Sequence, residues 1–210
     1  VLLSNKQLNE FQKYFKNIKI IPNFVNIPLK IADCNQKIVL SIGRLSEEKG
    51  FLRLVDIWEI AQKKMNDKNW KLHIIGEGEL KKELESKIKD KNLEDSIKIL
   101  SFTQNINKHY LNASIYIMCS YSEGMPMVLL ESSSFGLPNI AFDVKTGPSD
   151  IIENNKSGFL VKDGDLHEFA DKLIFLMEND NARKEMGKYA RVLIDKKFSK
   201  EVVIKKWFNL

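Results

Sequence analysis

The fold is decided by residues 115–131, which read IYIMCSYSEGMPMVLLE. The first five residues are mostly apolar, as in a buried strand, and a helical pattern begins at Pro126. Proline suits the first turn of a helix, because its missing N–H would have no partner inside the helix there. The stretch therefore predicts a strand, a loop and a helix start, with the backbone N–H groups of the three residues after Pro126 free to bind an anion.

Two glutamates lie on either side of this helix start. Glu123 falls in the loop before the helix, and Glu131 falls about one and a half turns into it. We expect both carboxylates to reach hydroxyl groups of one polar ligand whose phosphate faces the helix end. A phosphate flanked by hydroxyl groups is the chemistry of a nucleotide sugar, which these residues therefore favour as the ligand.

The composition argues against some classes of protein. With 210 residues, of which 43% are apolar, the chain is long enough for one large or two small soluble domains with a real core. The net charge of +5 is modest, and opposite charges alternate along most predicted helices, as in Lys81-Lys82-Glu83. This pattern is typical of a solvated face and argues against a nucleic-acid partner. The basic excess is largest in residues 6–30 and 184–206, which leaves binding to an anionic membrane surface or a phosphorylated substrate open.

Cysteine usage fits a reducing cytoplasm. Cys34 and Cys119 are the only cysteines and form no CxxC pair, so neither a disulfide framework nor a zinc site is expected. None of the three histidines has the spacing of a metal site or a catalytic triad, and we expect no metal. No apolar run approaches the roughly 20 residues of a membrane-spanning helix. The sequence begins at Val1 without an initiator methionine or a signal peptide, so we expect it to be part of a longer protein.

From Lys37 onward, short apolar runs alternate with amphipathic helical stretches. This alternation is typical of βα units that build a parallel sheet, and six strands joined by such crossovers form a doubly wound, Rossmann-like α/β fold. Strands are expected at residues 38–42, 71–75, 97–100, 115–119, 139–142 and 158–161. Helices are expected at residues 50–65, 79–91, 106–112, 126–135, 149–153, 166–178 and 182–194.

Three regions are expected along the chain. Residues 1–36 form a leading segment or interdomain linker, with a helix at 7–15, a short strand at 19–21 and a loop at 22–28. Residues 37–198 form the Rossmann-like ligand-binding domain. Residues 199–210 form a C-terminal helix whose apolar side chains need a partner outside that domain.

The loop after the first strand of the sheet, residues 43–51, is a candidate phosphate site, because doubly wound folds bind ligands at the carboxyl ends of their strands. Gly43 permits close approach of the backbone to a ligand. Arg44 provides a planar fork for phosphate oxygens and Lys49 a mobile point charge, so together they can neutralise a diphosphate. A solvated turn rich in lysine and glutamate is the alternative interpretation of the same residues.

Two other loops fall at the same edge of the predicted sheet. Gly76 opens a GxG motif that resembles half of a dinucleotide fingerprint. Because Lys81 stands at the third glycine position, a tight turn near a ligand is favoured over NAD binding. Phe102 and Thr103 lie in a loop whose backbone groups could read a base edge, and an ordinary loop explains them equally well.

Taken together, these motifs resemble the carboxyl-terminal domain of family 4 glycosyltransferases. The resemblance rests on GRL at 43–45, EKG at 48–50, EGMP at 123–126 with Glu131, GLP at 136–138 and GFLV at 158–161, and the leading IIPNFV at 20–25 is also similar. Order, spacing and strand context match over essentially the whole chain. One departure is GPSD at 147–150, which replaces the more frequent Gly-Gly-x-x-Glu and is similar to members that build surface glycans.

The resemblance implies a GT-B enzyme of two facing Rossmann-like domains, of which this chain is the donor-binding one. The implied activity is transfer of a hexose or N-acetylhexosamine, with retention of anomeric configuration, from a nucleotide sugar to a glycan or lipid-linked acceptor. The expected donor is a UDP-sugar, with no cofactor and no metal. The acceptor is expected to bind through a missing N-terminal domain, so the isolated chain should transfer no sugar. The implied setting is bacterial surface polysaccharide or lipopolysaccharide synthesis, in the cytoplasm or peripherally at the inner membrane.

The resemblance also implies roles for individual residues. Arg44 and Lys49 hold the donor diphosphate, Glu123 contacts the donor sugar, and Glu131 binds the ribose hydroxyl groups. The donor-binding set is completed by the helix start and by the three loops above, as Gly124, Met125, Pro126, Met127, Val128, Gly43, Gly76, Phe102 and Thr103. Arg44, Lys49 and Glu123 form the catalytic set, whose expected contribution is electrostatic, with no covalent nucleophile assigned.

Two alternatives stay open at this point. A noncatalytic nucleotide-binding or protein-interaction module would bind a nucleotide without supporting transfer. A sugar-nucleotide epimerase of the same fold would need other catalytic acids and bases and would form its product without an acceptor.

Overall fold

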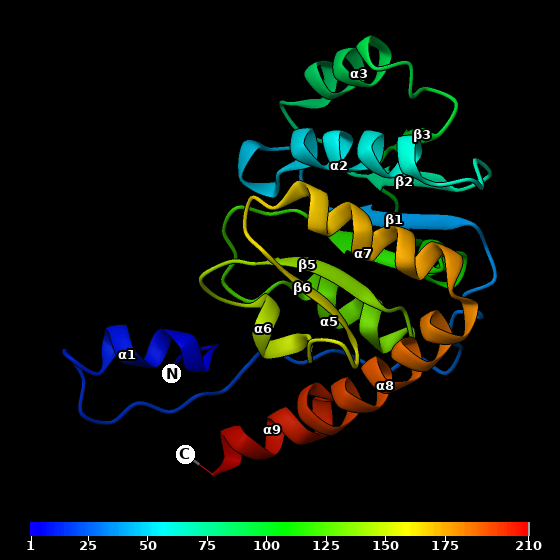
Figure 1. Cartoon of the computed structure of the whole chain (residues 1–210). Helices are drawn as coiled ribbons and strands as arrows, with labels where there is room; N and C mark the ends of the chain where they lie inside the picture. The colour runs from blue at the N-terminus through cyan, green and yellow to red at the C-terminus, as the bar shows by residue number, and fades with distance from the viewer. Residues whose placement is uncertain (210) are drawn as a thin grey trace.

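The computed structural model describes residues 1–209, apart from the side chains of Asn5 and Asn9, as one six-stranded sheet with helices on both faces (Figure 1). The strands are β1 (Ile38–Ile42), β2 (Lys71–Ile75), β3 (Ile97–Leu100), β4 (Ile115–Met118), β5 (Asn139–Asp143) and β6 (Gly158–Lys162). Their order is β3-β2-β1-β4-β5-β6, and every neighbouring pair is parallel. This is the order of a Rossmann-like doubly wound sheet, so the predicted fold class is confirmed.

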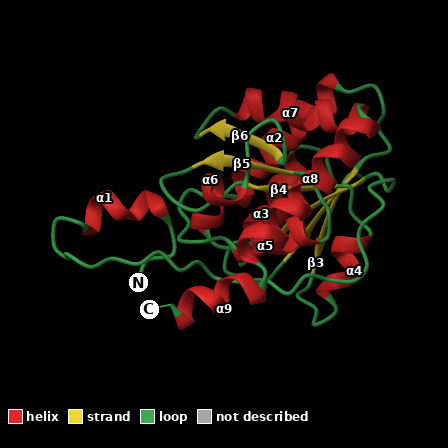
Figure 2. Cartoon of the chain, turned by 90° about the horizontal axis from the view of Figure 1, so that it is seen from below, coloured by secondary structure: helices red, strands yellow, loops and turns green. Residues whose placement is uncertain are grey.

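Helices form a layer on each face of the sheet, whereas the first helix lies apart from it (Figure 1). The helices are α1 (Leu8–Phe11), α2 (Phe51–Lys64), α3 (Lys81–Asp90), α4 (Ile106–Leu111), α5 (Met127–Ser134), α6 (Pro148–Ile151), α7 (Leu166–Glu178), α8 (Asp180–Phe198) and α9 (Lys200–Phe208), with 3-10 turns at Asn5–Gln7 and Glu47–Lys49. Figure 2 shows α2 and α7 on the other side of the strands from α4 and α5.

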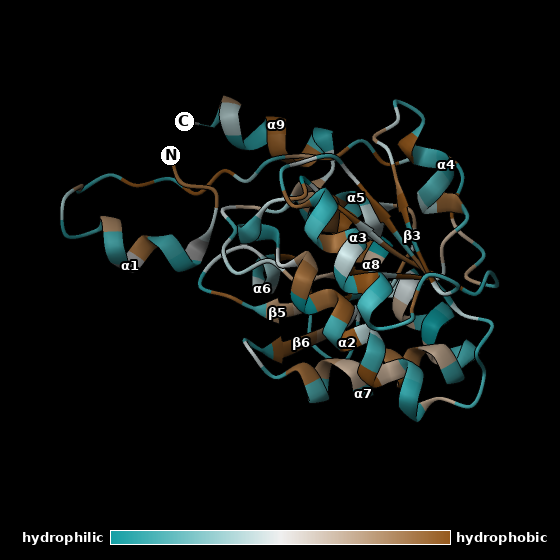
Figure 3. Cartoon of the chain, turned by 90° about the horizontal axis from the view of Figure 1, so that it is seen from above, coloured by the Kyte–Doolittle hydropathy of each residue, from teal (hydrophilic) through white to brown (hydrophobic). Residues whose placement is uncertain are grey.

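Alternate residues of the strands pack into two separate hydrophobic cores, because successive side chains of a strand face opposite sides of the sheet. Val39 and Ile117 pack in the core that also contains buried residues of α2, α3 and α7. Leu40 and Met118 pack in the core beneath α4, α5 and α8. Figure 3 shows hydrophobic colour along β3 and β6, with hydrophilic colour over much of the surrounding helices. A sheet buried on both faces leaves its edge at the carboxyl ends of the strands for a ligand.

The predicted elements of the domain are present with small changes at their ends. β4 ends one residue earlier than expected, at Met118, and β5 and β6 each continue one residue further. Among the helices of the domain, α8 differs most, since it runs over Asp180–Phe198 rather than over 182–194. Buried side chains continue along α8 to its last residue, Phe198, so its apolar stripe is longer than the sequence pattern suggested.

The first 21 residues contain less regular structure than predicted. The helix expected at 7–15 is reduced to the short α1 after a 3-10 turn. The strand expected at 19–21 is a single parallel bridge between Leu2 and Ile20, so that prediction was wrong. A strand forms only where a partner pairs along its length, and within the described residues this one bridge is the pairing that the segment makes.

The two ends of the chain lie on the same side of the molecule (Figure 2). Ser4 Oγ donates to Asp150 Oδ2 at 2.5 Å, and Lys6 Nζ lies 2.9 Å from Asp143 Oδ1. These contacts tie the leading segment to α6 and to the end of β5. The helix expected at 199–210 is present as α9, and its predicted last residue, Leu210, lies outside the described residues.

Both cysteines are buried free thiols. Burial raises the pKa of Cys34 to about 11 and that of Cys119 to about 12, so both thiols stay protonated at neutral pH. Within residues 1–209, no helix has the length and apolar character that crossing a membrane requires.

Candidate functional site

A cavity opens where the strand order reverses. β1 and β4 are neighbours in the sheet, but the helices that follow them, α2 and α5, pack on opposite faces. Doubly wound sheets bind their ligands at this switch point. The cavity has a volume of about 280 Å³. Its lining includes Gly43, Lys49, Phe51, Ser120, Glu123, Met125, Pro126, Met127 and Val128.

Lys49 and Glu123 form an ion pair inside this cavity. Lys49 Nζ lies 2.9 Å from Glu123 Oε1, and the same oxygen accepts a hydrogen bond of 2.6 Å from Ser120 Oγ. The Glu123 side chain is only 9% exposed and that of Lys49 is 25% exposed. An ammonium group has three N–H donors, so Lys49 can hold Glu123 and still donate to a phosphate oxygen of a ligand.

Gly50 lets the Lys49 loop approach the end of β4. Its φ is +66°, and a Cβ at this position would lie 1.9 Å from the backbone oxygen of Cys119. Nearby, the N–H of Tyr121 donates to the carbonyl of Glu48 at 2.8 Å. The loops after β1 and β4 are therefore joined through their backbones, which brings the two charged side chains together.

Arg53 is a buried cation that fixes the loop after β4. Its Nε and Nη2 donate to the carbonyls of Cys119 and Ser120, each at 2.6 Å. Its Nη1 donates to Asp163 Oδ1 at 2.7 Å, and its guanidinium lies 3.8 Å from the ring centre of Tyr121. Arg53 is not evident from the sequence, because its partners are mostly backbone oxygens. The signal that could have found it is a cation on the apolar face of the predicted helix after β1.

The start of α5 differs by one residue from the prediction. α5 begins at Met127, and Pro126 precedes it as the N-cap residue with φ −72° and ψ 103°. The N–H of Leu129 donates to the Pro126 carbonyl at 3.1 Å, so the expectation that it is free was wrong. The N–H groups of Met127 and Val128 find no backbone acceptor within residues 1–209. Both residues line the cavity, so these two groups are available to an anion.

The loop before α6 supports the Glu123 loop from the other side. Thr146 Oγ1 donates to the carbonyl of Glu123. Gly147 has a φ of +98°, and a Cβ there would lie 2.5 Å from Pro126 Cδ. Gly124 lies between these contacts and does not line the cavity itself. The backbone around Glu123 is thus supported by Thr146 and Gly147 of the loop before α6.

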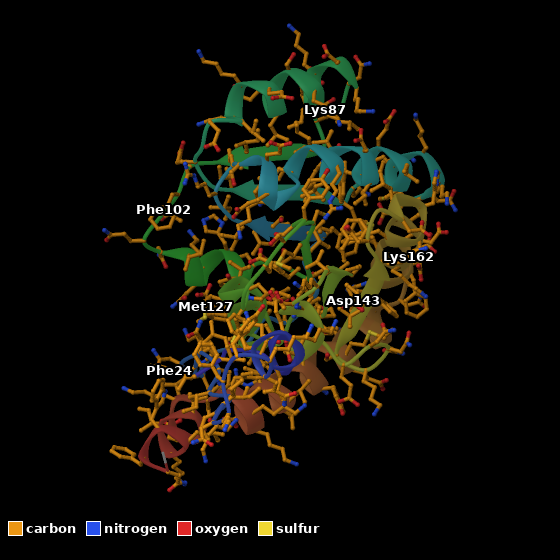
Figure 4. All side chains as sticks on the ribbon, turned by 90° about the vertical axis from the view of Figure 1, so that its left-hand side faces the viewer. Phe24, Lys87, Phe102, Met127, Asp143 and Lys162 are labelled. Carbon is orange, nitrogen blue, oxygen red and sulfur yellow. The ribbon has the colours of Figure 1, made fainter. Side chains whose placement is uncertain are left out.

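Glu131 lies in a second cavity beside the first. This cavity has a volume of about 350 Å³, and its lining includes Phe24, Ile106 and Met127. Met127 lines both cavities, so the two glutamates stand on either side of one residue. Burial raises the pKa of Glu131, and a hydrogen bond of 2.7 Å from the Tyr110 hydroxyl opposes that rise. Figure 4 shows Phe24, Met127 and Phe102 along one edge of the molecule.

The structure places Arg44 and Phe102 at the surface. Arg44 Nη2 lies 3.5 Å from Glu79 Oε2, its side chain is 74% exposed, and it does not line either cavity. Phe102 is 68% exposed and, with the half-buried Thr103, belongs to the loop between β3 and α4. The structure thus brings Gly43, Lys49, Glu123 and residues 125–128 together in one cavity. Arg44, Phe102 and Thr103 do not line that cavity.

Gly76 is placed inside the protein rather than in a cavity. A Cβ on Gly76 would lie 1.9 Å from the carbonyl oxygen of Gly43, so glycine is needed there for the approach of two loops. Among residues 1–209, no three or more His, Cys, Asp or Glu side chains come close enough to share a metal ion.

The structure thus shows a Rossmann-like domain with a cavity at its switch point, lined by the Lys49–Glu123 ion pair. Residues 29–193 match the family model described as Glycosyl transferases group 1. The chain belongs to this family, which confirms the resemblance seen in the sequence.

Named relatives and a solved structure agree with this assignment. The chain is 36% identical over 206 residues to the poly(ribitol-phosphate) alpha-N-acetylglucosaminyltransferase of Staphylococcus aureus. This alignment covers 97% of the chain and 41% of the relative. The chain is also 39% identical over 175 residues to the amylovoran biosynthesis glycosyltransferase AmsD of Erwinia amylovora. That alignment covers 83% of the chain and 48% of the relative.

The solved structure is a mutant of S. aureus TarM in complex with fondaparinux, alpha-GlcNAc-glycerol and UDP. It matches with a TM-score of 0.91 and 34% identity, over 99% of this chain and 42% of that one. The chain therefore spans about half the length of the curated relatives it matches.

Proposed function

We propose that this chain is the donor-binding domain of a retaining glycosyltransferase. The proposed enzyme transfers a hexose or N-acetylhexosamine from a UDP-sugar to a glycan or lipid-linked acceptor in bacterial surface polysaccharide or lipopolysaccharide synthesis. The observation that carries the proposal is the Lys49–Glu123 pair beside the start of α5 in the switch-point cavity. The family supports the transferase class, AmsD is named for amylovoran biosynthesis, and the TarM complex contains UDP.

In this proposal, the donor diphosphate binds between Lys49 and the start of α5. The N–H groups of Met127 and Val128 bind phosphate oxygens, where the helix dipole adds a favourable potential. Glu123 accepts hydrogen bonds from hydroxyl groups of the donor sugar. Arg44 reaches the diphosphate by leaving Glu79, which costs little because both side chains are mostly exposed.

In the proposed reaction, an acceptor hydroxyl attacks the anomeric carbon on the face from which the phosphate leaves. The bond between the anomeric carbon and the phosphate oxygen breaks, the glycosidic bond forms, and the leaving phosphate takes the proton of the acceptor. Lys49, Arg44 and the helix start stabilise the charge that develops on the diphosphate. We propose that these groups suffice without a divalent metal.

The acceptor is proposed to bind to a separate N-terminal domain, since the chain spans about half the length of its relatives. Residues 1–36 then serve as the linker, residues 37–198 as the donor domain, and residues 199–210 pack against the other domain. The exposure of Trp207 (50%) and Phe208 (85%) on α9 supports this last assignment. We place the enzyme in the cytoplasm, where the basic residues of 184–206 favour peripheral contact with the inner membrane.

Sugar transfer by the whole protein tests the proposal. Labelled UDP-glucose, UDP-galactose and their N-acetylated forms are supplied with lipid-linked and glycan acceptors, and the anomeric configuration of the product is measured by NMR. We expect one donor to be used with retention, and Lys49→Ala to reduce transfer by roughly 100-fold or more. Lys82→Ala, at an exposed position on α3, is the matched control.

Two outcomes contradict the proposal. A sugar nucleotide altered in the absence of acceptor indicates an epimerase. Nucleotide binding with no transfer to any acceptor indicates a binding module.

A further inference from the structure

Tyr110 is a completely buried tyrosine whose hydroxyl group meets a carboxylate of the candidate site. It lies on α4, and its hydroxyl donates to Glu131 Oε2 at 2.7 Å. Its ring stacks on Phe135, with 5.1 Å between ring centres, and contacts Tyr116 at 6.1 Å. The ring alone would satisfy this packing, so the hydroxyl group needs a separate explanation.

The hydrogen bond leaves one oxygen of Glu131 available. Oε2 is engaged by Tyr110, whereas Oε1 has no hydrogen-bond donor within residues 1–209. Glu131 lines the cavity of about 350 Å³ together with Ile106 and Asn107, which belong to the same helix as Tyr110. A carboxylate held through one oxygen presents the other in a defined direction, which is what recognition of a hydroxyl group requires.

The protonation states fit this arrangement. Burial raises the pKa of Tyr110 well above its usual value, so the phenol keeps its proton and acts as the donor. The same hydrogen bond lowers the pKa of Glu131 against the effect of burial, so it favours the ionised, accepting form of the carboxylate.

We propose that Tyr110 is a positioning residue that orients Glu131 so that its Oε1 accepts a hydroxyl of the donor ribose, and that this contact makes the site prefer ribonucleotides to deoxyribonucleotides. The proposal rests on the proposed function, because it takes the ligand to be a nucleotide sugar. It adds a residue outside both cavities to the set that determines specificity.

The test compares two nucleotides on one conservative variant. Tyr110→Phe keeps the ring and removes only the hydroxyl group. Wild type and variant are titrated by calorimetry with UDP and with 2′-deoxy-UDP. We expect wild type to bind UDP more tightly, and Tyr110→Phe to weaken UDP binding roughly 5- to 20-fold while changing 2′-deoxy-UDP binding much less.

A matched control is available on the surface. Tyr189 donates to Glu153 Oε2 at 2.7 Å, the same distance as in the Tyr110–Glu131 pair, but this second pair is exposed and outside both cavities. Tyr189→Phe removes the same kind of hydrogen bond and is expected to leave both affinities unchanged. The ratio of the two affinities is taken within each variant, so a partly unfolded sample does not alter it.

In the whole enzyme, Tyr110→Phe is expected to raise KM for the UDP-sugar and to leave kcat within about twofold, because the ribose contact is the same in the ground and transition states. If wild type binds UDP and Tyr110→Phe keeps the full preference for UDP over 2′-deoxy-UDP, the inference is overturned while the proposed function stands. If wild type binds neither nucleotide, the proposed function fails and the inference fails with it.

Discussion

Lys49 Nζ donates to Glu123 Oε1 at 2.9 Å, although 74 positions separate the two residues in the sequence. The pair joins the loop after β1 to the loop after β4, at the point where the strand order reverses. Because each charge is balanced by the other, the site holds both groups in place before a ligand binds. In the proposed donor complex, a diphosphate adds to Lys49 without replacing Glu123, and this would couple phosphate binding to the orientation of Glu123.

The two candidate phosphate cations are expected to differ in importance. Lys49→Ala should weaken UDP binding by about 1.5–3 kcal/mol, because it removes a charge-assisted hydrogen bond inside the cavity. Arg44→Ala should cost less, about 1 kcal/mol, because Arg44 is exposed and must first leave Glu79. Calorimetric titration with UDP measures both changes. Equal affinities for wild type and Lys49→Ala would remove the diphosphate from this part of the cavity.

Arg53 is expected to matter for stability and for the site together. Arg53→Met should destabilise the fold by about 2–4 kcal/mol, because it leaves the carbonyls of Cys119 and Ser120 buried without their donors. Urea denaturation measures the loss, with Lys63→Met, an exposed change on the same helix, as the control. If the two variants unfold at the same urea concentration, Arg53 does not hold the loop.

Comparing alanine substitutions at Gly50 and Gly164 distinguishes the cost of a left-handed backbone from the cost of a steric clash. Both have positive φ, at +66° and +86°, but a Cβ on Gly50 meets Cys119 at 1.9 Å, whereas a Cβ on Gly164 meets nothing within 4 Å. Gly164→Ala should cost about 1 kcal/mol, the usual cost of a left-handed conformation for alanine. Gly50→Ala should cost at least twice that, since the loops must also move apart. Similar urea midpoints for the two variants would contradict the packing described for Gly50.

Glu131 is expected to reduce stability at neutral pH. Its pKa is raised by burial, so the folded state holds the proton more tightly than the unfolded state. Protonated Glu131 stabilises the fold below the pKa that Glu131 has in the unfolded state. This contribution is lost as the pH rises through the higher pKa that Glu131 has in the folded state. Glu131→Gln, which cannot ionise, should therefore gain stability relative to wild type as pH rises from about 4 to 7.

Urea denaturation at several pH values checks this, with the exposed Glu85→Gln as the control. A stability difference between Glu131→Gln and wild type that does not change with pH would show that burial has no such effect on Glu131.

Much of the fold could be predicted because it depends on local pattern. Alternating apolar runs and amphipathic stretches located the six strands, and Pro126 located the start of α5 to within one residue. The strand at 19–21 was predicted wrongly, since pairing depends on a partner that a local pattern does not contain. The length of α8 was underestimated for the related reason that its end is set by buried contacts.

The sequence predicted those residues of the candidate site whose charge and position at a strand end suggest a function. Lys49 and Glu123 stood out as charges at strand ends, and the structure brings them together. Arg53, Ser120 and Tyr110 did not stand out, because their partners are backbone oxygens or carboxylates that only the fold brings within reach. Arg44 looked equivalent to Lys49 in the sequence, and its exposed pair with Glu79 became visible only in the structure.

We propose that this domain binds a nucleoside diphosphate through Lys49 and the start of α5. Calorimetric titration of the chain with UDP, GDP and ADP in the presence of EDTA tests it most directly, with circular dichroism to establish that the protein is folded. We expect saturable binding of one UDP per chain, weaker binding of GDP and ADP, and UDP binding weakened by about 1.5–3 kcal/mol in Lys49→Ala. Failure of the folded chain and of the whole protein to bind any of the three nucleotides would contradict it.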